Sequence, residues 1–223
     1  MNANMHPIPD AVFFDLDGTL VDSAPDMIEA MRRLRTDQGE SPLGAESIGA
    51  VVSRGGRAMI RRGFPDADEA RVEVLLPRFL ELYAAAIATH SALFPGMDSV
   101  LAALEARGTP WGVVTNKPGW LARALMAELS LHHRCAALVT GDCLPLKKPD
   151  PAPILRACEI AGVAAARSVY VGDDLRDIEA GHAAGMRTIA AGWGYLDGED
   201  PRSWGADCVI GSPAQLLTAM GLG

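Results

Sequence analysis

Residues 11–20, AVFFDLDGTL, combine a short apolar run with a polar turn and decide the fold. The run AVFFD (11–15) is rich in aromatic and branched side chains, which is typical of a buried strand. Asp15 and Asp17 stand at positions i and i+2, so their side chains leave the strand on the same side. Gly18 then permits a tight turn whose backbone N–H groups can face an anion. We therefore expect a buried strand that ends in two carboxylates and a binding turn.

Five further apolar runs of the same kind lie downstream, and segments with helical periodicity separate them. The expected strands are 111–115, 136–140, 168–171, 188–191 and 207–210, and the expected helices are 98–107, 119–129, 151–162, 174–184 and 213–220. Strand and helix thus alternate from residue 94 onward, which is the pattern of a parallel sheet with helices on both faces. We predict an α/β fold with a doubly wound parallel sheet, in which ligands bind beyond the carboxyl ends of the strands.

Residues 23–93 break this alternation. They contain three helical segments and no convincing strand; the segments are 24–35, 57–62 and 67–89. We interpret the stretch as a helical domain inserted after the first strand, which leaves 1–22 and 94–223 as the core. The two crossings between the domains, at 21–23 and 91–95, would then act as a hinge.

The composition is that of an ordinary globular protein. The chain has 223 residues, 49% of them hydrophobic, and a formal net charge of −8. This acidic balance argues against nucleic acid or an anionic membrane as the main partner, but a small anionic ligand responds to the local field of its site. The four cysteines lack metal-ligand spacing, and neither a secretory signal nor a membrane-spanning run is visible. We expect a cytoplasmic protein with reduced cysteines.

A second acidic cluster follows another expected strand. The segment VGDDLRD (171–177) places Asp173, Asp174 and Asp177 where a helix begins. In a parallel sheet this cluster emerges at the same edge as Asp15, where carboxylates raise one another's pKa unless a cation is present. Mg²⁺ suits a site of few carboxylates, water and phosphate, so we predict Mg²⁺ as the cofactor. The role of Asp174 stays open, since it could simply cap the helix.

Two other segments at strand ends carry groups that suit a phosphate. Thr115 and Asn116 offer a hydroxyl and helix-opening amides, and Lys147 and Lys148 offer ammonium charge. A helix N-terminus favours anions on its own. Together with the two acidic clusters, these groups supply a nucleophile, an acid/base, a cation site and counter-charge for phosphate oxygens. The chemistry that they predict is phosphoryl transfer.

The four segments resemble, in this order, the four motifs of the haloacid dehalogenase superfamily. DLDGTLVDS resembles the first motif, VVTNK the second, KKPDP the third and VGDDLRDIEAG the fourth. The helical insertion resembles the C1 cap of the phosphoglycolate phosphatase branch. VVSRGGRAM, WGVVTNKP and WGAD add a closer resemblance to the N-acetylmuramic acid 6-phosphate phosphatases. The resemblance implies a Rossmann-like core with a cap, and a phosphatase that acts on a small phosphorylated substrate.

The resemblance also implies a role for each matching residue. Asp15 would attack phosphorus and form an aspartyl-phosphate, and Asp17 would protonate the leaving oxygen and then activate water. Mg²⁺ would be bound by Asp15, the backbone carbonyl of Asp17 and Asp173, with Asp177 as a candidate ligand through water. The groups expected around the phosphate are the turn at Gly18, Thr115, the amide of Asn116 and Lys148, with Lys147 as the less favoured lysine.

The segment Ser53–Arg57 in the insertion is open to two interpretations. It is either a helix N-cap with its first turn, or a specificity loop above the active site. In the second interpretation Arg57, and after it Arg54, would bind the carboxylate of a lactyl ether or of glycolate, because a guanidinium suits planar carboxylates. The choice between N-acetylmuramate 6-phosphate and 2-phosphoglycolate as substrate stays open.

Three alternative functions share these features. A phosphosugar mutase and a halide-displacing dehalogenase occur on the scaffold that the resemblance implies, although Asp17 weighs against the dehalogenase, whose relatives need neither this acid nor a metal. A non-catalytic protein that binds phosphate ligands would be expected to lack Asp15 or Asp17, and both are present. The sequence leaves the oligomeric state open.

Overall fold

The computed structural model describes residues 8–41 and 43–222, and its centre is a parallel sheet of six strands. The strand order is β5-β4-β1-β6-β7-β8, with every neighbouring pair parallel. The strands are β1 (Val12–Phe14), β4 (Trp111–Val114), β5 (Ala137–Val139), β6 (Val169–Gly172), β7 (Arg187–Ala191) and β8 (Cys208–Ile210). The first strand in sequence thus lies inside the sheet, and its neighbours come from segments about 100 or more residues away.

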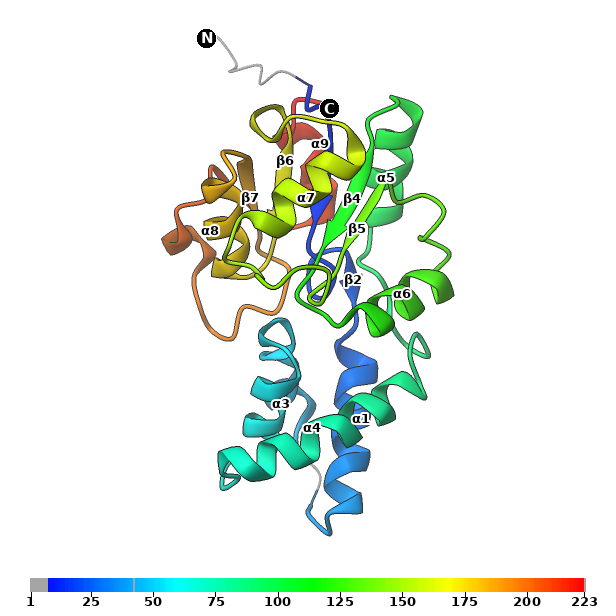
Figure 1. The fold of residues 1–223 in the computed structure, drawn as a ribbon, viewed down its shortest axis with the longest axis vertical. Helices are drawn as coiled ribbons and strands as arrows, with labels where there is room; N and C mark the ends of the chain where they lie inside the picture. Colours follow the sequence, from blue (N-terminus) through cyan, green and yellow to red (C-terminus); the bar gives the residue numbers. More distant parts are fainter. Residues whose placement is uncertain (1–7, 42, 223) are drawn as a thin grey trace.

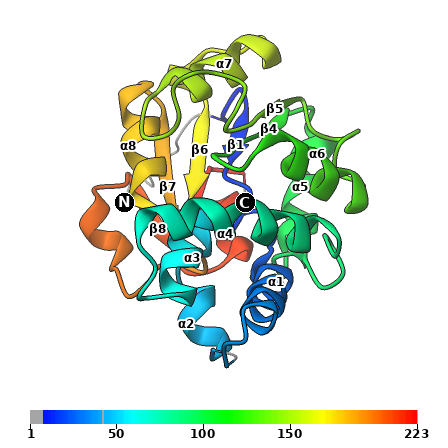
Figure 2. The same cartoon turned by 60° about the horizontal axis from the view of Figure 1, so that its bottom comes forward.

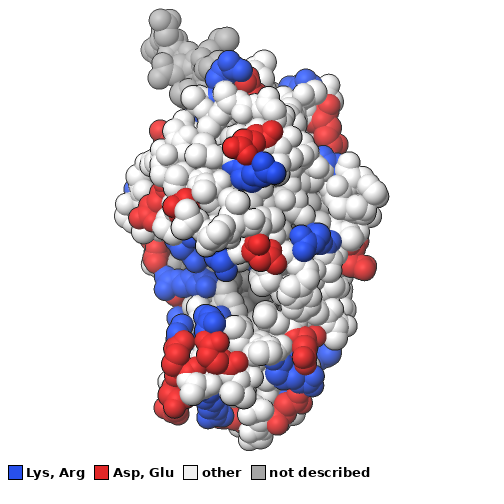
Figure 3. Space-filling view, in the orientation of Figure 1, with Lys and Arg blue, Asp and Glu red and all other residues white. Residues whose placement is uncertain are grey.

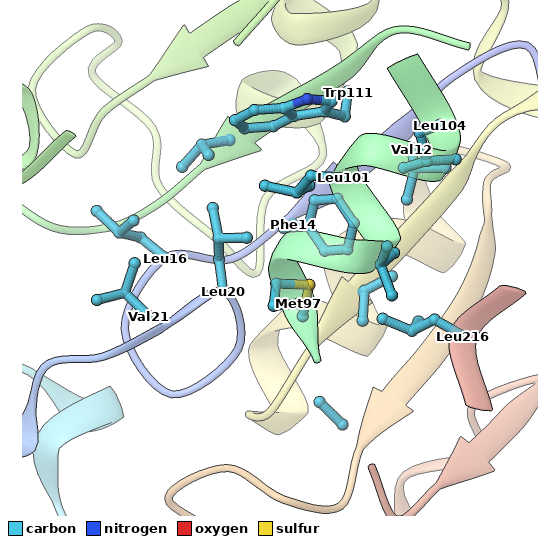
Figure 4. Packing of buried hydrophobic residues seen from close by; sticks show 14 of the residues in the cluster. Val12, Phe14, Leu16, Leu20, Val21, Met97, Leu101, Leu104, Trp111 and Leu216 are labelled. Atoms are coloured by element: carbon cyan, nitrogen blue, oxygen red, sulfur yellow. The ribbon is translucent and has the colours of Figure 1, made fainter. Parts of the chain in front are cut away.

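Helices cover both faces of the sheet, as the doubly wound prediction requires. Val12 and Phe14 point to the face covered by α5 (Met97–Ala106), α6 (Gly119–Glu128) and α9 (Leu216–Ala219), and Figure 4 shows Leu101, Leu104 and Leu216 packed there. Phe13 points to the opposite face, where α7 (Ala152–Ala161) and α8 (Leu175–Ala183) pack. This alternation is the period of two of a strand that is buried on both sides. The prediction of an α/β doubly wound core is confirmed.

Residues 24–84 form a helical unit at one end of the core (Figures 1 and 2). Its helices are α1 (Ala24–Asp37), α2 (Ala45–Gly49), α3 (Gly56–Gly63) and α4 (Glu69–Ala84). Their apolar faces share a cluster that includes Met31, Met59 and Phe79, distinct from the clusters that contain the sheet strands. The last helix ends at Ala84, five residues before the expected end at Thr89, and α2 was not expected from the sequence.

Two short antiparallel strands join the helical unit to the core. They are β2 (Val21–Asp22) and β3 (Ala92–Leu93), paired with Val21 opposite Leu93 and Asp22 opposite Ala92. The expectation of no strand between residues 23 and 93 is therefore wrong at Ala92–Leu93. The signal is weak there because two residues cannot display a period. The two crossings of the chain therefore lie side by side and are joined by strand pairing. No helix among the described residues has the length and apolarity that crossing a membrane requires.

Candidate active site

Three buried carboxylates from different elements meet beyond the carboxyl ends of two neighbouring strands. Asp15 follows β1, Asp173 follows β6, and Asp177 lies in the first turn of α8. One oxygen of each lies within 4.8 Å of the other two, and all three residues are buried. Since β1 and β6 are adjacent parallel strands, the sheet itself places the first two side chains together. The expected meeting of the two acidic clusters is present in the structure.

Lys148 lies against this cluster and balances part of its charge. Its Nζ lies 2.8 Å from Asp15 Oδ1 and 2.6 Å from Asp177 Oδ1, and it donates hydrogen bonds to the carbonyl of Val114 and the hydroxyl of Tyr170. Burial alone would lower the pKa of Lys148, but the Asp15 and Asp177 carboxylates outweigh it and hold the pKa well above its usual value. Lys148 is therefore a fixed positive charge in the site.

Asp173 is held by hydrogen bonds on both carboxylate oxygens. Thr19 Oγ1 donates to Oδ1 at 2.6 Å, while Ser53 Oγ and the backbone N–H of Tyr195 donate to Oδ2 at 2.6 Å and 2.9 Å. Gly18 passes so close that a Cβ on it would lie 2.1 Å from Asp173 Oδ2, and its φ is +86°. A side chain at position 18 would therefore both strain the turn and fill the space beside this carboxylate.

The charge of the cluster fits a divalent cation. Burial, and then the Asp15 charge, raise the pKa of Asp173; burial also raises the pKa of Asp177, despite the opposing effect of Lys148. Asp15 Oδ1 is buried and accepts no hydrogen bond, although the Lys148 ammonium lies nearby. Three carboxylates facing one ammonium are an excess of negative charge, and oxygen donors of this kind are what Mg²⁺ prefers.

The Asp17 side chain is not part of the three-carboxylate cluster, although Asp17 and Asp15 line the same cavity. Its two oxygens accept hydrogen bonds from Lys117 Nζ at 3.0 Å and 3.1 Å, and Oδ1 also accepts one from Ser23 Oγ at 2.6 Å. Lys117 is buried and lies 4.5 Å above the ring of Tyr83, which belongs to α4. Burial lowers the pKa of Lys117, while the Asp17 carboxylate acts in the opposite direction. Asp17 is thus oriented by a lysine from the core and a serine at the start of the helical unit.

The expected phosphate-binding residues lie around the same point. Thr115 follows β4, and its hydroxyl accepts the backbone N–H of Lys117 at 3.2 Å. The Asn116 side chain donates to the carbonyl of Lys148 at 3.0 Å and accepts its N–H at 3.1 Å. Asn116 therefore ties the segment after β4 to the segment that carries the buried lysine, so the two expected phosphate-binding segments form one surface.

A cavity of about 300 Å³ separates this surface from the helical unit, and the hollow is visible in Figure 3. Its core side includes Asp15, Asp17, Thr115, Asn116 and Lys148, and the wall contributed by the helical unit includes Val52, Leu76, Phe79, Leu80 and Tyr83. One side of the cavity is therefore charged and the other is largely apolar. This division is typical of sites that bind a small molecule with a few fixed polar contacts.

Arg54 and Arg57 both line the cavity, but carboxylates of the protein already pair with them. Arg57 donates to Glu73 Oε2 on α4 at 3.0 Å. Arg54 donates to Glu199 Oε1 at 2.6 Å and lies 3.2 Å from Asp197 Oδ2, both on the core. The segment that carries them is a 3-10 turn followed by α3, with the backbone of Gly55 as N-cap and no capping side chain. The segment therefore contains the N-cap and the first turn of α3 and also lines the cavity, while the Ser53 hydroxyl bonds to Asp173.

Comparisons with known proteins place the chain in a family. Residues 12–191 match the sequence profile of the haloacid dehalogenase-like hydrolases. The chain belongs to this family. A phosphoglycolate phosphatase of Xanthomonas campestris pv. campestris is 47% identical over 209 residues, which cover 93% of this chain and 95% of that protein. An N-acetylmuramic acid 6-phosphate phosphatase of Pseudomonas putida is 44% identical over 210 residues, covering 92% and 93%.

A solved structure agrees with the family assignment. The crystal structure of a predicted phosphoglycolate phosphatase from Haemophilus somnus superposes with a TM-score of 0.85 at 26% identity, covering 94% of this chain and 97% of that one. Sequence relatives and structural neighbour are thus similar over nearly the whole chain. The prediction of a haloacid dehalogenase-like hydrolase of the phosphatase class is confirmed.

Several residues of this hydrolase site were not predicted from its sequence. Lys117 stands next to the expected Thr115 and Asn116, so its place at a strand end was a usable signal. Tyr195 had no such signal, and although the segment Ser53–Arg57 was considered as a loop above the active site, the bond from Ser53 to Asp173 joins residues that are far apart in sequence. The open role of Asp174 is now clear: its carboxylate caps α8 by accepting the N–H of Arg176, whose guanidinium it also binds.

Proposed function

We propose that the protein is a Mg²⁺-dependent phosphomonoesterase that hydrolyses a small, carboxylate-bearing phosphate ester. The observation that carries the proposal is the buried Asp15, which lies on the cavity beside a fixed ammonium and two further carboxylates. A carboxylate that is fixed beside positive charge can attack phosphorus while its surroundings balance the charge of the ester.

Asp15 and Asp17 have different roles in the reaction. Asp15 attacks phosphorus, and the P–O bond to the leaving group breaks as the aspartyl-phosphate forms. Asp17, which also lines the cavity, gives a proton to the leaving oxygen and then takes one from the water that hydrolyses the intermediate. The hydrogen bonds from Lys117 and Ser23 fix the orientation of Asp17 for this role.

Mg²⁺ would be held by Asp15, Asp173 and the backbone carbonyl of Asp17, with Asp177 reached through water. When bound, the ion shields the nucleophile from the phosphate charge. The phosphoryl oxygens would contact Thr115, the amide of Asn116, Lys148 and the turn at Gly18. Lys148 supports this assignment best, because its charge is held buried beside the attacking carboxylate.

The size of the cavity favours a substrate larger than a two-carbon ester. A volume of about 300 Å³ is within the range of sites that bind drug-sized ligands, so 2-phosphoglycolate would leave much of it to water. A hexose 6-phosphate with a lactyl ether, such as N-acetylmuramate 6-phosphate, would also cover the apolar wall. The carboxylate of such a substrate would need a cation of the protein. Arg54 and Arg57 line the cavity, but each already pairs with acidic residues of the protein. Lys147 also lines the cavity and forms no ion pair among the described residues.

The proposed mechanism is tested with Asp15→Asn. We expect this variant to lose turnover of p-nitrophenyl phosphate in Mg²⁺, because an amide cannot form the aspartyl-phosphate. Asp98→Asn is the matched control, since Asp98 is exposed on α5 and pairs with Arg134, outside the cavity. Retained activity in Asp15→Asn, with purity checked by mass spectrometry, would contradict the mechanism.

The proposed substrate is tested by comparing kcat/KM on N-acetylmuramate 6-phosphate, 2-phosphoglycolate and common sugar phosphates. We expect the first ester to be preferred by at least tenfold, which corresponds to about 1.4 kcal/mol of transition-state binding. Release of inorganic phosphate identifies a phosphatase, whereas an isomerised sugar phosphate identifies the mutase alternative. Equal values for the two carboxylate esters would contradict the size argument.

A further inference from the structure

The loop from Trp193 to Glu199, which follows β7, contacts parts of the chain that are far apart in sequence. Trp193 Nε1 donates to the carbonyl of Thr19 at 3.1 Å, next to the turn at Gly18. The backbone N–H of Tyr195 donates to Asp173 Oδ2 at 2.9 Å. Thr19 Oγ1 also donates to Asp173. The loop therefore supports the Asp173 carboxylate directly through Tyr195 and indirectly through the bond from Trp193 to Thr19.

The Tyr195 side chain reaches the two crossings between the core and the helical unit. Its hydroxyl donates to Asp22 Oδ1 at 2.6 Å and accepts the backbone N–H of Ala24, the first residue of α1, at 2.9 Å. Its ring lies 6.2 Å from that of Phe94, just after the second crossing. One residue therefore holds Asp173 through its backbone and the start of the helical unit through its side chain.

The far end of the loop carries the charges that meet the helical unit. Asp197 Oδ2 lies 3.2 Å from Arg54 Nη1, and Asp197 Oδ1 accepts from Arg62 Nη2 at 3.2 Å. Glu199 accepts from Arg54 Nη2 at 2.6 Å. Ser53, the neighbour of Arg54, donates to the same oxygen of Asp173 that Tyr195 binds. The loop and the helical unit thus meet at Asp173 itself.

We propose that loop 193–199 is the docking site of the helical unit on the core, and that Tyr195 is a positioning residue that couples the start of α1 to the orientation of Asp173. The proposal rests on the proposed function only in taking Asp173 as a metal ligand. In this arrangement a displacement of α1 moves the Tyr195 hydroxyl, and the adjoining backbone N–H moves with it. The Asp173 carboxylate is then correctly oriented only when the helical unit is docked.

Tyr195→Phe tests the coupling, because it removes the hydroxyl but keeps the ring and the backbone N–H. We expect the Mg²⁺ concentration at half-saturation, measured by thermal shift, to rise about fivefold, the effect of about one hydrogen bond. Asp22→Ala should reproduce this rise, whereas Asp22→Asn, which keeps an acceptor oxygen, should not. Because Asp22→Ala reports on the same bond independently, a poorly folded Tyr195→Phe does not block the test.

Asp197→Asn tests the docking contacts separately. Asn tolerates the left-handed backbone at this position, where φ is +47°, so only the charge is lost. We expect KM for the preferred ester to rise about threefold, since partly exposed ion pairs contribute little, and half-saturating Mg²⁺ to rise in the same direction but by less than in Tyr195→Phe. Asp37→Asn, which breaks an ion pair with Arg78 inside the helical unit, is the matched control and should change neither value.

Each outcome supports or overturns the proposal. A rise in half-saturating Mg²⁺ in Tyr195→Phe and Asp22→Ala, absent in Asp22→Asn and Asp37→Asn, supports the coupling. Wild-type Mg²⁺ binding in the first two variants overturns it, even if their Tm falls, because a merely structural role predicts that loss of Tm alone. Failure of the proposed function can be told apart from failure of the coupling. The first would leave the wild-type protein without turnover, whereas the coupling is measured by a Mg²⁺ titration that needs no substrate.

Discussion

The backbone of Gly18 passes close to the Asp173 carboxylate. Gly18 has a φ of +86°, and a Cβ there would lie 2.1 Å from Asp173 Oδ2. Gly39 also has a positive φ, of +73°, but no atom lies within 4 Å of its Cβ position. A side chain at either position would be strained by the left-handed backbone, but only a side chain at position 18 would also collide with Asp173, the expected metal ligand.

We predict that Gly39→Ala lowers the free energy of unfolding by about 1 kcal/mol, because alanine is strained at positive φ, and that Gly18→Ala lowers it by more, because its methyl group also collides with Asp173. Only Gly18→Ala should also abolish the Mg²⁺-dependent rise in Tm and the hydrolysis of p-nitrophenyl phosphate, since the added methyl group displaces Asp173. Urea unfolding and a Mg²⁺ thermal-shift titration measure the two effects. A Gly18→Ala protein with normal Mg²⁺ binding would show that the turn does not shape the site.

At this scale the sequence indicated carboxylates better than it indicated their partners. Asp15 and Asp173 were predictable because each follows an apolar run, and parallel strands place such positions at one edge. Lys117 bonds to Asp17 across 100 positions, and Ser53 bonds to Asp173 across 120. Such contacts depend on how the helical unit and the loops pack, which local patterns do not encode.

Among the elements, those with a clear period were predictable. The six strands of the core lie within one or two residues of the expected ranges, because buried parallel strands are continuous apolar runs. The five-residue α2 and the two-residue β2 and β3 were missed, since so few residues cannot show a helical or a strand period. The strands β2 and β3 lie within or beside the two segments where the chain was expected to cross between core and insertion, but their pairing was not foreseen.

Helix α4 gives the cavity its apolar wall, and this wall makes a prediction about substrate size. Leu76, Phe79, Leu80 and Tyr83 line the cavity from one side of the helix, whereas Val74 is 74% exposed on another side. A bulky substrate would cover this wall, and a two-carbon ester would leave it uncovered. The contribution of the wall therefore depends on the substrate, which separates a binding surface from a merely structural one.

We predict that Leu80→Ala lowers kcat/KM for N-acetylmuramate 6-phosphate about tenfold, because the lost contacts are worth roughly 1 to 2 kcal/mol. The value for 2-phosphoglycolate should change less than twofold, since this ester does not reach the wall. Val74→Ala, on the same helix but outside the cavity, is the control and should leave both values unchanged. An equal loss on both esters would instead mean that Leu80 supports the fold of the unit.

For the whole molecule, the buried acidic cluster predicts that stability depends on pH and on Mg²⁺ together. Burial, with the neighbouring Asp15, raises the pKa of Asp173 to about 7, and burial raises that of Asp177 to about 8. An unfolded aspartate has a pKa of about 3.9, so between about pH 4 and pH 7 the folded protein binds more protons than the unfolded chain. The free energy of unfolding then falls as pH rises. Carboxyls with a lowered pKa, such as Asp174, lose their contribution only at lower pH.

We therefore predict that the Tm of the Mg²⁺-free protein falls between about pH 5 and pH 8, and that the rise in Tm on adding Mg²⁺ grows over the same range. The second effect follows because a divalent cation binds the ionised carboxylates, so binding must displace protons at low pH and need not do so at high pH. Thermal unfolding across this range with Mg²⁺ or with EDTA measures both. In Asp173→Asn one of the two titrating groups is gone, so both slopes should flatten. A Mg²⁺ effect that is the same at pH 5 and pH 8 would mean that the cation binds elsewhere than at this cluster.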